Sequence, residues 1–223
     1  MKELLAIFKK DNLIDRAFQR TYEMMDITQN MFLEAKRSLR EEDTNRLTIN
    51  IYDQDIAVNK FEREVRRNVL SHLVVSGTQD LYSGLTLVSI IIDIERVGDY
   101  TKNIIEIAQN HPAKLEGGIY NDDLIRVEKA VEEVFSRIRN AFEKADQEEA
   151  RKLCEDYGWI TKMCDQHAID YLNGRDTTIS SSDAVALSLY FRYLKRIYAH
   201  LRNVASSVIN PFDKIGFYKK KTD

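Results

Sequence analysis

One stretch of the sequence occurs twice, 100 residues apart. DIERVGDYTKN lies at 93–103, and a diverged copy, YLKRIYAHLRN, lies at 193–203. Two polar and three apolar positions are kept between the copies: Arg96, Asn103, Ile94, Val97 and Ile104 match Arg196, Asn203, Leu194, Ile197 and Val204. A chain of 223 residues with this repeat is expected to fold as two modules of about 100 residues each.

Each half contains three long amphipathic stretches separated by short polar breaks, and only 8 Gly and 2 Pro interrupt the whole chain. Both features favour long helices over a turn-rich β fold. In the first half, the predicted helices are about 11–40, then about 44–75 after the N-cap Asp43, and a third that follows the break at Gly77 and ends at about 110. In the second half, they are about 124–145, then a helix from the N-cap Asp146 to about 172, and a last helix that follows the 173–183 loop and ends at about 210. The predicted fold is therefore all-α, with two tandem antiparallel three-helix bundles.

The clearest linker in the sequence contains Pro112, Gly117 and Gly118. We therefore expect a first bundle at 1–110, a linker at 111–120 and a second bundle at 121–223. The second bundle ends in a basic tail, Lys219–Lys221.

Charge and apolar content exclude several classes of protein. The net charge of −3 and the pI near 5.9 give no field that favours nucleic acid. The apolar run at 85–92 is too short to cross a bilayer, so we expect no direct membrane insertion. Cys154 and Cys164 lie too far apart along one helical stretch to bridge each other. They are expected to be reduced thiols, which places the protein in the cytoplasm.

Oxygen-bearing side chains recur at helical spacing in two stretches of the first half. One contains Glu95, Asp99 and Asn103, and the other contains Asp55, Asn59 and Glu62. Gly98 would let a neighbouring helix come close to the first stripe. Two facing stripes of this kind repel each other unless they are protonated or bridged by a cation. Oxygen ligands suit magnesium, calcium, manganese or iron. The alternative is that these are solvated charges on the outer faces of the helices.

The same residues carry a family resemblance. ERVGDYTKNIIE at 95–106 resembles the third-helix signature of the PhoU family of phosphate-transport regulators, and DIAVNKFEREV at 55–65 is similar to the second-helix block of that family. The resemblance implies two antiparallel three-helix bundles. It also implies iron or other divalent metal ions in the first repeat only, bound by Glu95 and Asp99 with Asp55, Asn59 and Glu62, and no organic cofactor.

The second repeat departs from this pattern. Lys195 and Ala199 replace the paired carboxylates, and Tyr198 stands where the family has a glycine. On the preceding helix, Asp156 falls at the place of Asp55. Our hypothesis is a degenerate site in which Lys195 pairs with Asp156 and so removes the need for a metal ion.

The resemblance implies a non-enzymatic regulator of phosphate uptake and phosphate signalling. Such a protein would be a metal-binding adaptor and a homodimer, and its partners would be the ATPase or membrane subunit of a phosphate transporter and a sensor histidine kinase. A metal-free structural or dimerising interaction module is the alternative. An enzyme is the third class, but the sequence has no phosphate-binding glycine loop and assembles no nucleophile with its base.

Overall fold

The computed structural model describes residues 13–41 and 47–217, and within these ranges it contains helices and no strand. The helices are α2 (Leu13–Arg40), α3 (Ile51–Ser76), α4 (Leu81–Asn110), α5 (Asn121–Glu143), α6 (Gln147–Asp156), α7 (Trp159–Leu172) and α8 (Ser181–Ile209), with two short 3₁₀ turns, η1 (Gly118–Tyr120) and η2 (Phe212–Lys214). The predicted all-α fold class is confirmed. Asp43 and the basic tail lie outside the described residues.

Local side-chain signals set several helix ends. The Asn50 side chain accepts hydrogen bonds from the backbone N–H groups of Tyr52 and Asp53, so α3 begins seven residues later than the predicted Thr44. Gly77 ends the helix with a φ of 70°. At the start of α8, Ser180 and Asp183 form a reciprocal capping box.

The middle helix of the second half is broken, which corrects the prediction of one continuous helix to about 172. Asp146 is the predicted N-cap, but α6 ends at Asp156 and α7 starts at Trp159. The turn between them contains Tyr157, a largely buried residue whose hydroxyl accepts a hydrogen bond of 2.9 Å from Arg137. Gly158 follows directly. The backbone leaves the helical geometry at Tyr157, with φ −103° and ψ 6°, whereas Gly158 already has the φ and ψ of a helix.

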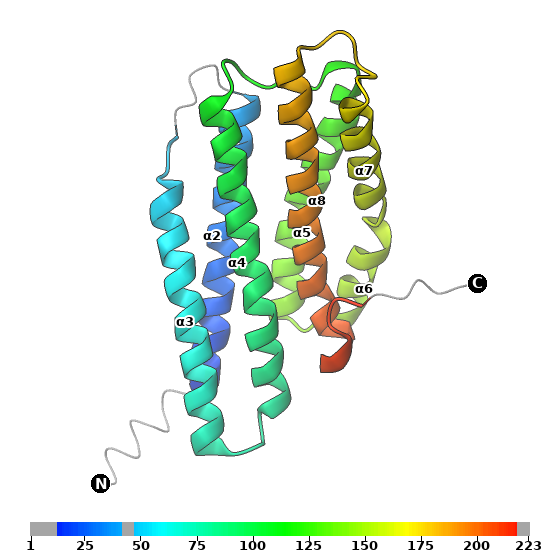
Figure 1. Ribbon diagram of the computed structural model, residues 1–223. Coiled ribbons are helices and arrows are strands. Elements are labelled where there is room, and N and C mark those ends of the chain that lie inside the picture. The colour runs from blue at the N-terminus through cyan, green and yellow to red at the C-terminus, as the bar shows by residue number, and fades with distance from the viewer. Residues whose placement is uncertain (1–12, 42–46, 218–223) are drawn as a thin grey trace, which may run out of the picture.

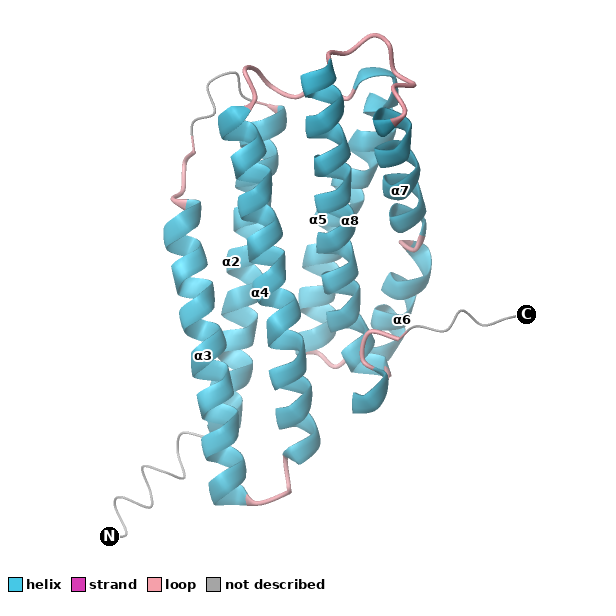
Figure 2. Cartoon of the chain, viewed as in Figure 1, coloured by secondary structure: helices cyan, strands magenta, loops and turns pink. Residues whose placement is uncertain are grey.

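The two bundles lie side by side (Figures 1 and 2), with α2 against α5 and α4 against α8. The helices α3 and α6–α7 lie on the outer flanks. Matching core positions of the repeat are all at most 1% exposed: Ile94, Val97, Ile104, Leu194, Ile197 and Val204. The aromatic residues of α8 also belong to the core, since Tyr190, Phe191 and Tyr198 are buried. The boundaries 1–110, 111–120 and 121–223 stay a prediction.

The contact between α4 and α8 is built from the repeated stretches themselves. Asp93 accepts hydrogen bonds from His200 Nδ1 at 2.7 Å and Asn203 Nδ2 at 2.9 Å. Under the 100-residue offset, the counterparts of Asp93 and His200 are Tyr193 and Tyr100, and these two rings also meet, with centroids 6.0 Å apart. The two copies therefore face each other across an approximate two-fold axis, with a polar pair on one side and an aromatic pair on the other.

Within residues 13–41 and 47–217, none of the helices combines the length and apolar character needed to span a bilayer.

Candidate functional site

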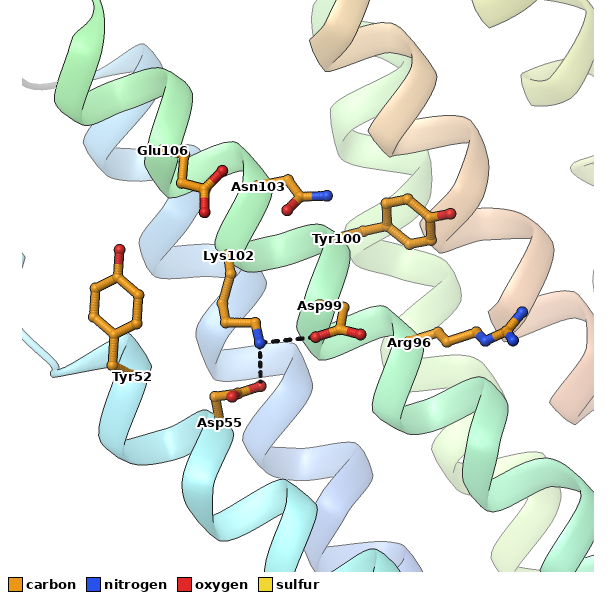
Figure 3. A pocket seen from close by; sticks show the side chains of 8 residues that line it. All are labelled: Tyr52, Asp55, Arg96, Asp99, Tyr100, Lys102, Asn103 and Glu106. Atoms are coloured by element: carbon orange, nitrogen blue, oxygen red, sulfur yellow. Dashed lines mark ion pairs between the residues drawn. The ribbon is translucent and has the colours of Figure 1, made fainter.

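Three members of the two predicted stripes, Asp55, Asp99 and Asn103, line a solvent-accessible cavity of about 550 Å³ between α3 and α4 (Figure 3). Asp55 comes from the first turns of α3, and Asp99 comes from the middle of α4. The helical spacing read from the sequence places both on the facing sides of these antiparallel helices. The cavity is lined by Tyr52, Asp55, Arg96, Asp99, Tyr100, Lys102, Asn103 and Glu106.

A lysine joins the two carboxylates. Lys102 Nζ lies 2.8 Å from Asp99 Oδ1 and 3.0 Å from Asp55 Oδ1, and Figure 3 shows its ammonium group pointing between them. Asp55 and Lys102 are largely buried, with side chains 15% and 23% exposed. Solvent therefore screens the contact between them only partly.

Two other predicted ligands also have partners within the protein. The Asn59 amide nitrogen is 3.2 Å from Asp55 Oδ2 and donates to it. The Glu62 carboxylate is 2.7 Å from the Arg66 guanidinium, one helical turn further along α3. Neither side chain extends freely toward the cavity.

Glu95 lies one turn before Asp99, on the same side of α4. Burial, the Asp99 carboxyl and the Glu62 carboxyl raise the pKa of Glu95 from 4.5 to about 7. A carboxyl group with this pKa is partly protonated at neutral pH. Protonation of Glu95 thus relieves part of the repulsion that the sequence predicted between the stripes.

The residues as placed do not fit a bound metal ion. The cation position between Asp55 and Asp99 belongs to the Lys102 ammonium. In the described part of the chain, no three His, Cys, Asp or Glu side chains come close enough together to hold an ion. The stripes do face each other, as predicted. Lys102 balances the charge of one aspartate, Arg66 balances that of Glu62, and partial protonation reduces that of Glu95.

In the second bundle, the predicted partner of Lys195 is wrong. Lys195 Nζ lies 2.6 Å from Asp165 Oδ1 and Oδ2, and Arg192 is 3.9 Å from the same carboxylate. Asp156 is an exposed residue at the end of α6. The break between α6 and α7 shifts the register of the second helix, so Asp165 on α7 takes the position opposite Lys195.

The role of Lys102 was missed in the sequence, although a signal for it was present. Lys102 follows Asp99 by three residues, a spacing that places an ammonium beside a carboxylate on one helix face. Its second partner, Asp55, lies on another helix, and no local spacing predicts that contact.

Comparison with known protein families finds a match, which lies in the first bundle. The family model of the PhoU domain matches residues 21–108, which include α3, all but the last two residues of α4, and the residues that line the cavity. No curated protein matches the chain.

Two solved structures share the fold of the whole chain. The crystal structure of PhoU from Pseudomonas aeruginosa has a TM-score of 0.77 at 17% identity, over 88% of this chain and 95% of that one. The crystal structure of the phosphate transport system regulatory protein PhoU from Streptococcus pneumoniae has a TM-score of 0.72 at 14% identity, over 87% and 92% of the two chains. The first bundle is therefore similar to the PhoU domain, and the chain shares the fold of the two PhoU structures over both bundles.

Proposed function

We propose that this protein regulates phosphate transport without catalysing a reaction. It acts as a cytoplasmic adaptor that contacts the ATPase or membrane subunit of a phosphate transporter and a sensor histidine kinase. The observation that carries the proposal is the PhoU family match over residues 21–108, together with a fold shared along nearly the whole chain with a phosphate transport system regulatory protein.

The side-chain chemistry of the described residues supports an adaptor over an enzyme. Three charged groups of the α3–α4 cavity, Asp55, Asp99 and Lys102, are paired with one another. The two thiols are unreactive, because burial raises the pKa of Cys154 to about 11 and that of Cys164 to about 12. An open, charged cavity of this kind is suited to recognising a partner surface, and its described residues offer no activated nucleophile.

The resemblance also implies that regulation depends on iron or divalent ions in the first bundle. The position of Lys102 instead favours a regulator that works without a bound ion. The proposed function therefore needs no metal, and partner binding should be unchanged by a chelator.

The test combines genetics with purified components. Deleting the gene in its own organism should raise the output of a phosphate-starvation reporter in phosphate-rich medium, and a plasmid copy should restore repression. The purified protein should bind the purified ATPase subunit or the cytoplasmic part of the kinase, with and without EDTA. A deletion strain with unchanged reporter output and unchanged phosphate uptake would overturn the proposal.

A dimerising interaction module is the second candidate, and one surface feature favours it. Exposed aliphatic side chains gather at the turn between α3 and α4, with Leu70, Val74 and Val75 at 66%, 77% and 82% exposed and Leu81 and Leu85 nearby on α4. Exposed apolar clusters of this kind mark protein contacts, and here the occupant would be a second copy of the chain.

Light scattering coupled to gel filtration tests this candidate. The wild type should be a dimer, and Val74→Glu should be a monomer with unchanged helicity. Leu172→Glu is the matched control, because Leu172 is 75% exposed but lies on α7, away from this turn. A monomeric wild type, or a Val74→Glu dimer, rules out dimerisation through this surface.

A further inference from the structure

In both bundles, a lysine of the last helix reaches a carboxylate of the middle helix. Lys102 on α4 contacts Asp55 on α3, and Lys195 on α8 contacts Asp165 on α7. The two lysines do not occupy equivalent positions in the repeat, since Lys195 corresponds to Glu95. Each bundle thus reaches the same electrostatic arrangement with a different residue.

We infer that Lys102 is a built-in cation that takes the place of a metal ion in the first bundle. Its Nζ lies 2.8 and 3.0 Å from one oxygen each of Asp99 and Asp55, which are hydrogen-bonding distances. A divalent ion such as Mg²⁺ would need the same oxygens at about 2.1 Å. Ammonium and metal ion therefore compete for one position, and the tethered ammonium is always present.

The charge balance explains why Lys102 is sufficient. Asp55 and Asp99 contribute two negative charges, of which Lys102 compensates one while lying within ion-pair distance of both carboxylates. Nearby, Arg66 compensates Glu62, with the guanidinium and the carboxylate 2.7 Å apart. A divalent ion entering this site would meet a positive charge already in place, and the two would repel each other at short range.

Removing Lys102 should convert this arrangement into a cation site. Asp55 and Asp99 would then face each other without a counter-charge, beside the carboxyl of Glu95. A divalent ion with a preference for oxygen ligands relieves that repulsion. The ion would be held by these two carboxylates and by water, since no third acidic side chain among the described residues is close enough to join them.

The second bundle supplies an internal control. Lys195 has the same kind of contact, but Asp165 is the one carboxylate within reach of its ammonium in the described residues. Removing Lys195 leaves a single carboxylate beside Arg192, which is 3.9 Å away. This arrangement is too poor in anionic ligands to hold a divalent ion.

The experiment titrates Mn²⁺ into metal-free full-length protein by calorimetry and follows the melting temperature in parallel. The variants are Lys102→Met and Lys102→Gln, with Lys102→Arg to keep the positive charge and Lys195→Met as the matched control. We expect the two uncharged Lys102 variants to bind Mn²⁺ at least about tenfold more tightly than the wild type. Saturating Mn²⁺ should raise their melting temperature by roughly 5 °C or more. Lys102→Arg and Lys195→Met should behave like the wild type.

Two outcomes would overturn the inference. One is a wild type that binds one Mn²⁺ as tightly as Lys102→Met does. The other is a pair of folded Lys102→Met and Lys102→Gln variants with no gain in affinity. Adding Asp99→Asn to Lys102→Met should abolish the gain, and a gain that survives this change places the ion elsewhere. The inference stands independently of the proposed function, because every readout is ion binding and none is regulation of transport.

Discussion

Gly84 and Gly98, both in α4, differ in how much space the neighbouring helices leave for a side chain. A Cβ atom on Gly98 would make ordinary contacts, 3.7 Å from Thr28 Cγ2 and 3.8 Å from Met31 Cε. A Cβ atom on Gly84 would lie 2.9 Å from Val69 Cγ1, which is too close. The packing at Gly98 therefore leaves room for a side chain, and Gly84 is the position where the missing side chain is required.

Alanine at these two glycines should therefore have opposite effects on stability. Gly98→Ala should stabilise the protein by about 0.5–1 kcal/mol, because alanine favours the helix and meets no clash. Gly84→Ala should destabilise it by about 1 kcal/mol, because the β-branched Val69 has to move. Urea denaturation of both variants and the wild type measures the difference. Equal effects at the two positions would contradict this account of the packing.

The pKa of Glu95 gives stability a predictable dependence on pH. Glu95 holds its proton up to about pH 7 in the folded protein, but its ordinary value is 4.5. Between these values the folded state binds more protons than the unfolded state, so this group's contribution makes stability fall as pH rises. Glu95→Gln should remove that decline and stabilise the protein at pH 7.5 by about 1 kcal/mol, after allowance for solvent screening.

Denaturation at pH 5 and pH 7.5 checks this prediction. Glu116→Gln is the control, since the Glu116 side chain is 64% exposed. The wild-type difference between the two pH values should shrink in Glu95→Gln and persist in Glu116→Gln. A difference that is the same in all three proteins would show that Glu95 titrates near its ordinary value.

At the scale of elements, α2 and α5 are joined by charged contacts of two kinds. Arg40 at the end of α2 lies 2.9 Å from the buried Glu128 carboxylate, which also accepts a hydrogen bond from Tyr190. Burial raises the pKa of Glu128, and the Arg40 charge opposes that shift. Near the other end of the pair, Arg139 lies 3.1 Å from Asp26, whose side chain is 54% exposed. The first contact is shielded from water and the second is not.

Neutralising the two arginines should therefore have unequal effects. Arg40→Met leaves Glu128 buried without its counter-charge and should destabilise the protein by about 3–5 kcal/mol. Arg139→Met, at an exposed pair, should change stability by about 1 kcal/mol or less. Guanidinium denaturation of the two variants measures both values. Similar losses in the two would mean that burial of Glu128 does not set the strength of its contact.

At the scale of the whole molecule, the two bundles share a continuous interior. Phe32 and Phe135 stack across α2 and α5 with ring centroids 5.3 Å apart, and Asp93 and His200 join α4 to α8. Unfolding one bundle would expose the apolar side chains that the other bundle covers. The repeat divides the sequence into two modules, but packing couples the modules energetically.

The protein should consequently unfold in one cooperative transition. Trp159, the single tryptophan, reports on the second bundle, whereas circular dichroism at 222 nm reports on all the helices. The two signals should give the same urea midpoint, and the calorimetric and van't Hoff enthalpies should agree. A tryptophan midpoint distinct from that of the dichroism signal would show that the bundles unfold independently.

The sequence by itself determined which residues share a helix face. It predicted the all-α class, the repeat with its matching apolar positions, and the carboxylate stripes of α3 and α4, because each of these depends on spacing along the chain. The tertiary structure decided which residues meet across helices. In the tertiary structure Lys102 pairs with Asp55, and Lys195 pairs with Asp165 and not with Asp156. Contacts of this kind depend on the relative rotation and register of packed helices, which spacing along a single helix does not fix.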